Sequence, residues 1–492
     1  MTLRELLVAV EPCEVAGEDD PPVKGICYDS RLAKPGDIFF AWQGMRVDGH
    51  RFLPDVVKKG VSAVVGERAP GMLPPHIPYV RVGNAREALA LMADRFHGHP
   101  SASMDLVGVT GTNGKTTTAF LVHHILERSG RRTGLIGTVR YQAGESVLNA
   151  HRTTPEGSDL QELLAAMRDR GCRAAVLEVS SHGLAQGRVA GLAFAVGVFT
   201  NLTSDHLDFH GNLESYRAAK AILFERLAVS ERKGTAVVNA DDPAWRALGS
   251  SSRKPKRVFF YSALGEPQAD FRADGVRKDS SGSSFRLSYP GGSFPVTVPL
   301  LGSFNVENAL AAFAAAFALG ISPEESARAL ECFSGVPGRM ERFRSSDGVI
   351  AVVDYAHTED ALRKTLQALR ELAPKRLGIV VGCGGNRDRT KRPKMAAVAC
   401  ELADRVFFTA DNPRSESIEE IFADMAKGVP PGNRPAWIPD RLLAIEEALR
   451  KAEGGDLICV AGKGHETTQE VQGAFLPFDD RSAVSKALAE RG

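Results

Sequence analysis

A glycine-rich turn between an apolar run and a helix-forming stretch is the feature that most constrains this chain. Leu106–Thr110 is a short apolar run of strand type, and Lys115 opens a helical stretch that reaches about Arg128. Glycines in such a turn let backbone N–H groups converge on phosphate oxygens, and the N-terminus of the following helix adds a favourable dipole. The turn therefore predicts a nucleotide-phosphate site inside an α/β domain.

The side chains in and after the turn supply the rest of the chemistry. Lys115 would neutralise charge on the β- and γ-phosphates, and the Thr116 hydroxyl would bind magnesium. The spacing is GxxGKT, because position 109 is Val where the general motif has Gly. An ordinary glycine-rich turn is the alternative, but the Lys-Thr pair and the strand-to-helix context favour a site. The expected ATP-binding residues are Gly111, Thr112, Asn113, Gly114, Lys115, Thr116 and Thr117.

Short apolar runs alternate with helical stretches along most of the chain. After the turn they fall at Ala174–Val179, Ala195–Thr200 and Ala236–Asn239, and later at Val349–Val353, Leu377–Val381, Val406–Thr409 and Leu457–Ala461. This alternation predicts parallel sheets with both faces covered. The first hundred residues instead show short β-like runs at Asp37–Ala41, Ala63–Val65 and Tyr79–Val82. We predict an α/β fold of three domains: an N-terminal α/β domain (1–103), a central P-loop ATPase-like parallel-sheet domain (104–337) and a Rossmann-like domain (338–492).

Composition argues against several classes of protein. The 492 residues carry 61 Lys and Arg against 60 Asp and Glu, so whole-chain charge gives no reason to expect a nucleic-acid or membrane partner. Seven cysteines are scattered without CxxC spacing, which fits free thiols in a reducing compartment. The N-terminus lacks signal-peptide features, and the longest apolar run, Ala309–Leu319, is too short for a membrane span. We expect a cytoplasmic protein without membrane insertion, in which that run is a packed helix.

Two segments with acidic or histidine side chains follow predicted strands. Glu178 ends the Ala174–Val179 run, where it is either a magnesium partner or one of the many acids that end strands. Asp205-His-Leu-Asp-Phe-His210 comes just after the next run. Ligands of open α/β sheets gather at the carboxyl ends of strands, so both segments are candidates. The residues alone indicate a magnesium-dependent ATPase fold with an undefined acceptor.

Several segments, in order, resemble the Mur ligase family over nearly the whole chain. They are Thr110–Thr117, Glu178–Leu184, Asn201–Asp208, Tyr216–Lys220, Leu301–Asn308 and Asp354–His357. Three later segments resemble the family members that add meso-diaminopimelate to a UDP-N-acetylmuramoyl dipeptide in peptidoglycan synthesis: Gly384–Arg389, Asp411–Arg414 and Ala461–Glu466. The resemblance implies an ATP-dependent ligase that forms ADP and phosphate through an acyl phosphate.

The resemblance also implies roles for residues around the phosphate turn. Lys115 and Thr116 would hold the phosphates and one magnesium ion, while Glu178 and His206 would bind a second. Lys220 would be carbamylated to N6-carboxylysine, which turns a cation into an anionic magnesium ligand. Without the resemblance, Lys220 reads as a solvated helix residue. The implied catalytic residues are thus Lys115, Glu178, His206 and Lys220.

Further residues are implied for the nucleotide and the UDP-linked substrate. Asp29-Ser30-Arg31 resembles the family's uridine-binding segment, so residues 1–103 would hold the UDP substrate. The muramoyl dipeptide would be gripped by Thr153, Thr154, Ser180, Gln186 and Arg188. Asn305, Asp354 and His357 would line the nucleotide pocket, although Asn305 equally suits the N-cap of the Ala-rich helix.

For the amino acid, the resemblance implies a site of Arg387, Asp411, Asn412, Pro413, Arg414, Gly462 and Glu466. The chemistry agrees, because the free end of diaminopimelate has a carboxylate that Arg387 and Arg414 can pair with, and an ammonium that suits Glu466. Lysine lacks that carboxylate and would leave arginine desolvated and unpaired. Two positions depart from the family pattern: Glu359 replaces a Pro, which could loosen a turn, and Val381 replaces a common Phe.

Three alternatives stay open on the sequence. A lysine-adding relative differs mainly in the quartet at Asp411–Arg414. A folylpolyglutamate synthase shares the phosphate turn but is not expected to carry that quartet or a uridine-binding domain. A nucleotide-dependent regulatory protein would keep the fold without ligating. The expected partners are small molecules only, with Mg²⁺ as cofactor and ATP as co-substrate, and we expect a monomer.

Overall fold

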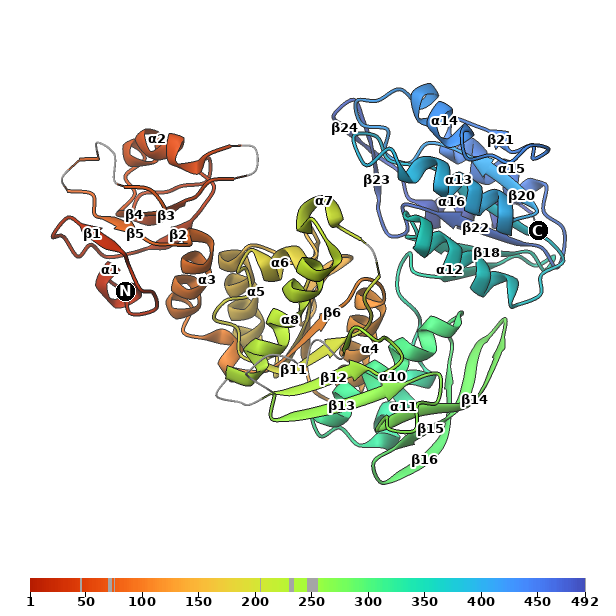
Figure 1. The fold of residues 1–492 in the computed structure, drawn as a ribbon, viewed down its shortest axis with the longest axis horizontal. Coiled ribbons are helices and arrows are strands. Elements are labelled where there is room, and N and C mark those ends of the chain that lie inside the picture. The colour runs from red at the N-terminus through yellow and green to blue at the C-terminus, as the bar shows by residue number, and fades with distance from the viewer. Residues whose placement is uncertain are drawn as a thin grey trace. The chain divides into compact units, whose positions relative to one another are not determined.

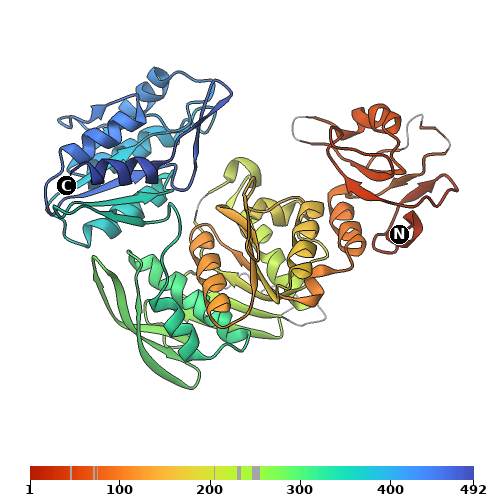
Figure 2. The same ribbon diagram turned by 180° about the vertical axis from the view of Figure 1, so that it is seen from behind.

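The computed structural model describes residues 1–44, 47–69, 73–74, 76–203, 205–229, 234–245 and 255–491. The chain divides into two compact units. One contains Met1–Tyr261 with Ala311–Ser326, and the other contains Ser262–Leu310 with Ala327–Gly492. Figures 1 and 2 show their helices and strands from opposite sides.

The first unit begins with a small five-stranded sheet of order β1-β5-β4-β3-β2. Its strands are β1 (Glu14–Ala16), β2 (Gly25–Cys27), β3 (Asp37–Ala41), β4 (Ala63–Gly66) and β5 (Tyr79–Arg81), and only the β1–β5 pair is antiparallel. Helices α1 (Leu3–Leu7), α2 (Leu53–Lys58) and α3 (Ala85–Phe96) accompany the sheet, with the 3₁₀ turns η1 (Gly49–Phe52) and η2 (Pro100–Ser103). Because side chains alternate along a strand, Ile38 and Phe40 pack with α3 residues while Phe39 and Ala41 pack with Val56 of α2.

The first unit then holds eight strands of a larger sheet, in the order β13-β12-β11-β6-β10-β7-β8-β9. The strands from β13 to β7 run parallel, and β8 and β9 are antiparallel additions. Their bounds are β6 (Asp105–Thr110), β7 (Thr133–Ile136), β8 (Arg140–Ala143), β9 (Ser146–Asn149), β10 (Ala174–Glu178), β11 (Phe194–Phe199), β12 (Thr235–Asn239) and β13 (Arg257–Ser262). The helices are α4 (Lys115–Arg128), α5 (Gly157–Asp169), α6 (Ser181–Ala185), α7 (Leu207–His210) and α8 (Leu213–Val229).

The second unit has its own parallel-rich sheet, of order β17-β18-β22-β19-β20-β21. These strands are β17 (Glu341–Arg344), β18 (Ile350–Asp354), β19 (Leu377–Val381), β20 (Arg405–Phe408), β21 (Ala436–Trp437) and β22 (Leu457–Ala461), and only β17 is antiparallel. One face packs on α12 (Glu359–Arg370), α13 (Lys391–Leu402) and α14 (Ile418–Ala426), the other on α15 (Arg441–Arg450) and α16 (Asp480–Ala489).

The remaining elements complete the second unit and its boundaries. The second unit also contains the antiparallel strands β14 (Phe271–Asp279), β15 (Gly282–Tyr289) and β16 (Gly292–Val298), and the hairpin β23 (Thr468–Val471) to β24 (Ala474–Pro477). Two unit boundaries fall within α10 (Ser303–Ala318) and α11 (Pro323–Glu331), and a third falls within β13. Within the described residues, no helix has the length and apolar character that crossing a membrane requires.

The predicted α/β fold class is confirmed, and most predicted strands are found within one or two residues of their expected ends. The apolar run from Ala309 lies in the buried helix α10, as expected. Asn305 is not the N-cap of this helix, because α10 begins two residues earlier; its side chain instead donates to the Leu301 carbonyl at 2.7 Å. Glu359 is the first residue of α12, which Thr358 caps, so the helix begins there without the family proline. The limits at 103/104 and 337/338 stay predictions.

Candidate active site

The phosphate turn joins β6 to α4 in the first unit. Gly111 and Gly114 have φ angles of 152° and 83°, and a Cβ on Gly111 would lie 1.8 Å from Thr200 Oγ1, so only glycine fits there. The Lys115 ammonium donates to the carbonyls of Gly111 and Thr112, both at 2.9 Å. Asn113 N donates to Asn201 Oδ1 at 2.9 Å. The turn is therefore held by its own lysine and by the segment after β11.

Glu178 ends β10 beside this turn and is fully buried. Its carboxylate accepts hydrogen bonds from the Thr116 hydroxyl at 2.9 Å, the Thr138 amide at 2.8 Å and the Thr138 hydroxyl at 3.0 Å. A Cβ on Gly137 would come within 2.2 Å of Glu178 Oε1, so this glycine permits the close approach. The structure thus brings the two predicted oxygen donors, Thr116 and Glu178, into direct contact. Sequence reasoning missed Thr138, whose only signal was its position just after a buried strand.

Lys220 lies in α8 with 1% of its surface exposed. Burial, reinforced by the neighbouring charge of Lys115, lowers the pKa of its ammonium well below the ordinary value. Its Nζ lies 4.2 Å from the ring centroid of Tyr216, whose hydroxyl is 3.1 Å from Thr112 Oγ1. A buried lysine of this kind is no solvated helix residue. A neutral amine is also the form that reacts with carbon dioxide.

His206 precedes α7 and adopts φ 53°, a left-handed conformation that is uncommon outside glycine. Its ring is about half exposed and packs edge-on against His182, with centroids 4.8 Å apart. Asp205 lies 3.5 Å from its Nε2. Burial lowers the pKa of His206; Asp205 opposes this shift, and Lys115 and Lys220 add to it to a lesser extent. The predicted residues His206, Lys115 and Lys220 therefore lie close enough for their charges to interact.

A hydrogen-bond network joins most residues predicted to grip the dipeptide. Thr154 Oγ1 donates to the Glu178 carbonyl at 2.9 Å and lies 3.0 Å from Ser180 Oγ. Arg188 donates to the Thr154 carbonyl and to Gln186 Oε1, both at 2.7 Å. Thr153 Oγ1 lies 3.0 Å from the hydroxyl of Thr138. The network connects these residues to Glu178, and through it to Thr116.

Glu156, which the sequence did not single out, is buried at the centre of three arginines. Its Oε1 is 2.6 Å from Arg152, 3.1 Å from Arg188 and 3.5 Å from Arg86 of α3. Arg86 also lies over the ring of Trp42, with its Cζ 5.0 Å from the centroid. The cluster joins the small N-terminal sheet region to the dipeptide-gripping residues.

The predicted uridine segment lies in the same small domain. Asp29 and Arg31 form an ion pair at 2.5 Å that lowers the pKa of Asp29, and Lys59 donates to the Ser30 carbonyl at 2.8 Å. The preceding residue, Tyr28, donates to Asp159 Oδ2 at 2.8 Å. Ser30 thus lies two residues from a direct link between the N-terminal region and α5.

In the second unit, three loops that follow β19, β20 and β22 meet. Gly385 N donates to the Asn412 carbonyl at 2.9 Å, and Asn412 Nδ2 donates to Glu466 Oε2 at 2.9 Å. Arg414 Nη1 donates to the Gly385 carbonyl at 2.8 Å. A Cβ on Gly384 would lie 3.1 Å from Arg414 Nη1 and 3.7 Å from Arg387 Cγ, so both arginines flank this glycine. The structure brings Arg387, Arg414 and Glu466 into one loop cluster.

The same cluster contains charged groups that sequence reasoning missed. Lys463 is fully buried and donates to Asn412 Oδ1 and Glu466 Oε2, both at 3.0 Å, and to the Thr468 carbonyl at 2.7 Å. Glu470 accepts from Arg414 Nε at 2.8 Å. Asp411 Oδ2 would be 2.6 Å from a Cβ on Gly462, which explains the need for glycine there. Two of the predicted charges, Arg414 and Glu466, therefore have internal counterions in Glu470 and Lys463.

Two of the residues predicted for the nucleotide pocket border this cluster. Asp354 is buried, which raises its pKa, and it accepts from Met340 N, Ala356 N and the Thr365 hydroxyl. His357 is exposed, with Nδ1 2.8 Å from the Tyr355 carbonyl. Tyr355 itself has a pKa raised to about 12 by burial and by Glu466. The third residue, Asn305, lies in α10 and bonds to Leu301 and Asn308.

The donor set suits a hard divalent cation in part. Thr116 and Glu178 offer a hydroxyl and a carboxylate side by side, which are ligands that Mg²⁺ prefers. An amine at Lys220 is a poor ligand for it, whereas a carbamate there would add oxygens. Within the described ranges, no group of three or more His, Cys, Asp or Glu side chains is placed to hold a metal ion. A Mg²⁺ site here thus depends on the Thr116 hydroxyl and on carbamylation of Lys220.

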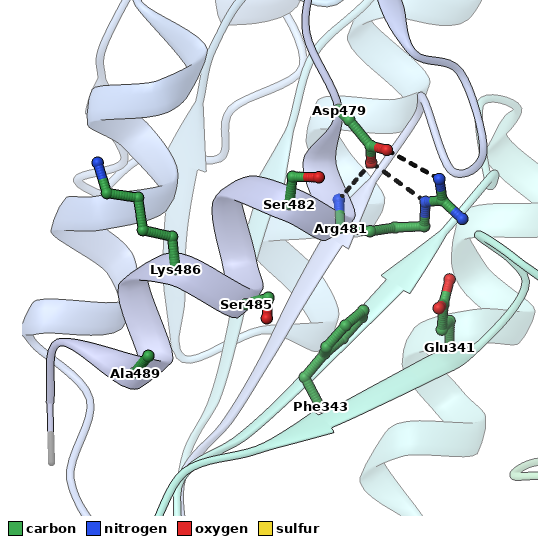
Figure 3. A pocket seen from close by; sticks show the side chains of 8 residues that line it. All are labelled: Glu341, Phe343, Asp479, Arg481, Ser482, Ser485, Lys486 and Ala489. Carbon is green, nitrogen blue, oxygen red and sulfur yellow. Dashed lines mark hydrogen bonds and ion pairs between the residues drawn. The ribbon is translucent and has the colours of Figure 1, made fainter.

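A separate groove of about 480 Å³ lies in the second unit between β17 and α16 (Figure 3). Three of the charged side chains that line it have partners within the protein. Asp479 pairs with Arg481 at 2.8 Å, and Glu341 accepts from Gly338 N at 2.7 Å. It contains none of the predicted site residues.

The phosphate turn on one parallel sheet and the parallel-rich sheet of the second unit define a multidomain α/β protein of nucleotide-binding type. Family comparisons match residues 22–97 to the Mur ligase family catalytic domain, 109–316 to the Mur ligase middle domain and 338–464 to the Mur ligase glutamate ligase domain. The chain belongs to the Mur ligase family.

Individual relatives match this chain over nearly its whole length. A UDP-N-acetylmuramoyl-L-alanyl-D-glutamate–2,6-diaminopimelate ligase from Geobacillus kaustophilus is 43% identical over 477 residues, 96% of each chain. The ligase of the same name from Gloeobacter violaceus is 44% identical over 493 residues, 100% of this chain and 99% of that one. A solved structure of a ligase of this name is 34% identical and superposes with a TM-score of 0.68, covering 96% of this chain and 95% of the other.

Proposed function

We propose that this protein is an ATP-dependent ligase that joins meso-2,6-diaminopimelate to the D-glutamate of UDP-N-acetylmuramoyl-L-alanyl-D-glutamate. The full-length similarity to ligases of that name supports the activity. The observation that carries the choice of amino acid is the loop cluster in which Arg387 and Arg414 flank Gly384 while Glu466 contacts Asn412. Two guanidinium groups and a carboxylate fit the carboxylate and ammonium of diaminopimelate, whereas lysine has no distal carboxylate to accept from the remaining guanidinium N–H groups.

The proposed chemistry has two steps. An oxygen of the D-glutamate carboxylate attacks the γ-phosphorus of ATP, which gives an acyl phosphate and ADP. The amine of diaminopimelate then attacks the acyl carbon, loses a proton and expels phosphate through a tetrahedral intermediate. Phosphoryl transfer of this kind relies mainly on positioning and charge compensation. The reaction therefore needs groups that hold phosphates and groups that hold each substrate.

Residues of the first unit would serve the phosphoryl transfer. The Lys115 ammonium and the turn amides would hold the β- and γ-phosphates. The hydrogen bonds from Lys115 to the carbonyls of Gly111 and Thr112 keep its ammonium at the phosphate turn. Thr116, Glu178, His206 and a carbamylated Lys220 would hold Mg²⁺, which when bound offsets phosphate charge. The network of Thr153, Thr154, Ser180, Gln186 and Arg188 would orient the dipeptide, and Ser30 would bind the uridine end.

Mass spectrometry of the product tests this function. The protein is incubated with the UDP-linked dipeptide, ATP and an equimolar mixture of lysine and meso-diaminopimelate, with Lys115→Ala as the inactive control. We expect the diaminopimelate product and phosphate release that requires both acceptor and amino acid. A lysine product would point to the lysine-adding relative. Phosphate release without the dipeptide would instead support a regulatory nucleotide-hydrolysing protein.

A further inference from the structure

The hairpin β23–β24 docks on the Asp411–Arg414 loop through both backbone and side-chain bonds. Arg414 N donates to the Glu470 carbonyl at 3.0 Å, and Gln472 N donates to the Arg414 carbonyl at 2.7 Å. Asn412 Oδ1 accepts from Glu470 N at 3.0 Å, and Gln469 Nε2 donates to the Asp411 carbonyl at 2.7 Å. The loop that carries the predicted amino-acid residues is therefore held along one side by this hairpin.

Within this contact, Glu470 fixes the direction of the Arg414 side chain. Arg414 Nε donates to Glu470 Oε2 at 2.8 Å, and Nη1 donates to the Gly385 carbonyl at 2.8 Å. The two side chains are only 22% and 26% exposed. A guanidinium has five N–H donors in a rigid fork, so these two bonds set its plane and leave the other donors for a ligand. Arg414 also adopts φ 54°, which a loosely held arginine would avoid.

We propose that Glu470 is a positioning residue for the amino-acid substrate: it fixes the Arg414 guanidinium so that its remaining N–H groups meet the substrate's distal carboxylate. This inference rests on the proposed function and deepens it. Two effects of Glu470 oppose each other. Its hydrogen bond orients Arg414 before binding, which reduces the ordering cost, while its negative charge repels the arriving carboxylate. Glutamine keeps the hydrogen-bond acceptor without the charge, and alanine removes both.

The test compares Glu470→Ala and Glu470→Gln with the wild type at saturating ATP and UDP-linked dipeptide. We expect Glu470→Ala to raise the KM for diaminopimelate about tenfold while kcat stays within about twofold. Glu470→Gln should give a KM at or below about twice the wild-type value. Glu401→Gln is the matched control, because Glu401 pairs with Arg363 at 2.7 Å on α12 and α13, outside the loop cluster.

Several outcomes separate this inference from the proposed function. An unchanged KM in Glu470→Ala, or an equal rise in Glu470→Gln and Glu470→Ala, overturns the positioning role while the wild-type product still supports the ligase. A rise in the KM for ATP alongside that for diaminopimelate, or an equal rise in Glu401→Gln, would indicate general disturbance and also overturn it. If the wild type forms no diaminopimelate product, both proposals fail.

Discussion

The hydroxyl of Thr116 donates a 2.9 Å hydrogen bond to the carboxylate of Glu178, which is 62 residues away in sequence. Thr116 lies in the first turn of α4 and Glu178 at the end of β10, and both side chains are buried. The parallel pairing of β10 with β6 places these two ends at the same edge of the sheet. Two oxygen donors are thereby placed beside the phosphate turn.

Replacing Glu178 tests this pair. In Glu178→Gln an amide would face the hydroxyls of Thr116 and Thr138, and the anionic oxygen would be lost. We expect kcat to fall about 100-fold and the Mg²⁺ concentration for half-maximal activity to rise about tenfold, because the cation loses a charged partner. Steady-state assays across a Mg²⁺ series measure both. Activity close to that of the wild type at all Mg²⁺ concentrations would remove Glu178 from the metal site.

Stability as a function of pH tests the state of Lys220. Burial holds its pKa well below 10.5, so between the folded pKa and 10.5 the unfolded chain binds a proton there that the folded chain does not. The free energy of unfolding should therefore rise with pH across this window, by up to about 1.4 kcal/mol per pH unit from this residue. Urea unfolding of the wild type and Lys220→Met from pH 7 to 9, in buffers free of carbon dioxide, measures the difference. Parallel curves would show that Lys220 is charged in the folded protein.

Arg414 is the residue on which amino-acid choice should depend most. Removing it takes away a guanidinium that contacts Gly385 and Glu470 and would pair with the distal carboxylate. Loss of one partner of a desolvated charge pair costs about 2–5 kcal/mol, so Arg414→Ala should raise the KM for diaminopimelate at least about 30-fold. The KM for ATP should stay within about twofold. Arg363→Ala, which removes a partly exposed arginine of the same unit, serves as the control. Unchanged amino-acid kinetics would end the specificity argument.

Glu156 should matter for both stability and substrate binding. Its single buried carboxylate faces Arg86, Arg152 and Arg188, so Glu156→Gln leaves these cations without their shared counterion. We expect the free energy of unfolding to fall by about 3 kcal/mol and the KM for the UDP-linked dipeptide to rise. Glu162→Gln, an exposed change on α5, should alter neither. Chemical denaturation measures the free energy of unfolding, and initial-rate assays measure the KM. If Glu156→Gln is as stable as the wild type, water solvates the charges of the three arginines in place of the carboxylate.

The local elements and the chemical character of the site could be predicted from sequence. The apolar run before Gly111 and the helix after Gly114 follow from short-range preferences, and the structure places them at Asp105–Thr110 and Lys115–Arg128. The roles of residues that depend only on neighbours close in sequence could likewise be predicted. Asn305 shows the limit of this reasoning, because a helix start two residues earlier excludes its alternative role as an N-cap and leaves an internal side-chain bond.

The sequence by itself determined that a phosphate turn, strand-end acids and an Asp-Asn-Pro-Arg loop exist, since each is encoded by adjacent residues. Only the tertiary structure decided that Lys220 is buried, that Thr138 contacts Glu178, and that Lys463 and Glu470 neutralise Glu466 and Arg414. The physical reason is that these pairings depend on which strand ends lie side by side. Strand order is set by packing of the whole sheet, so no single segment encodes it.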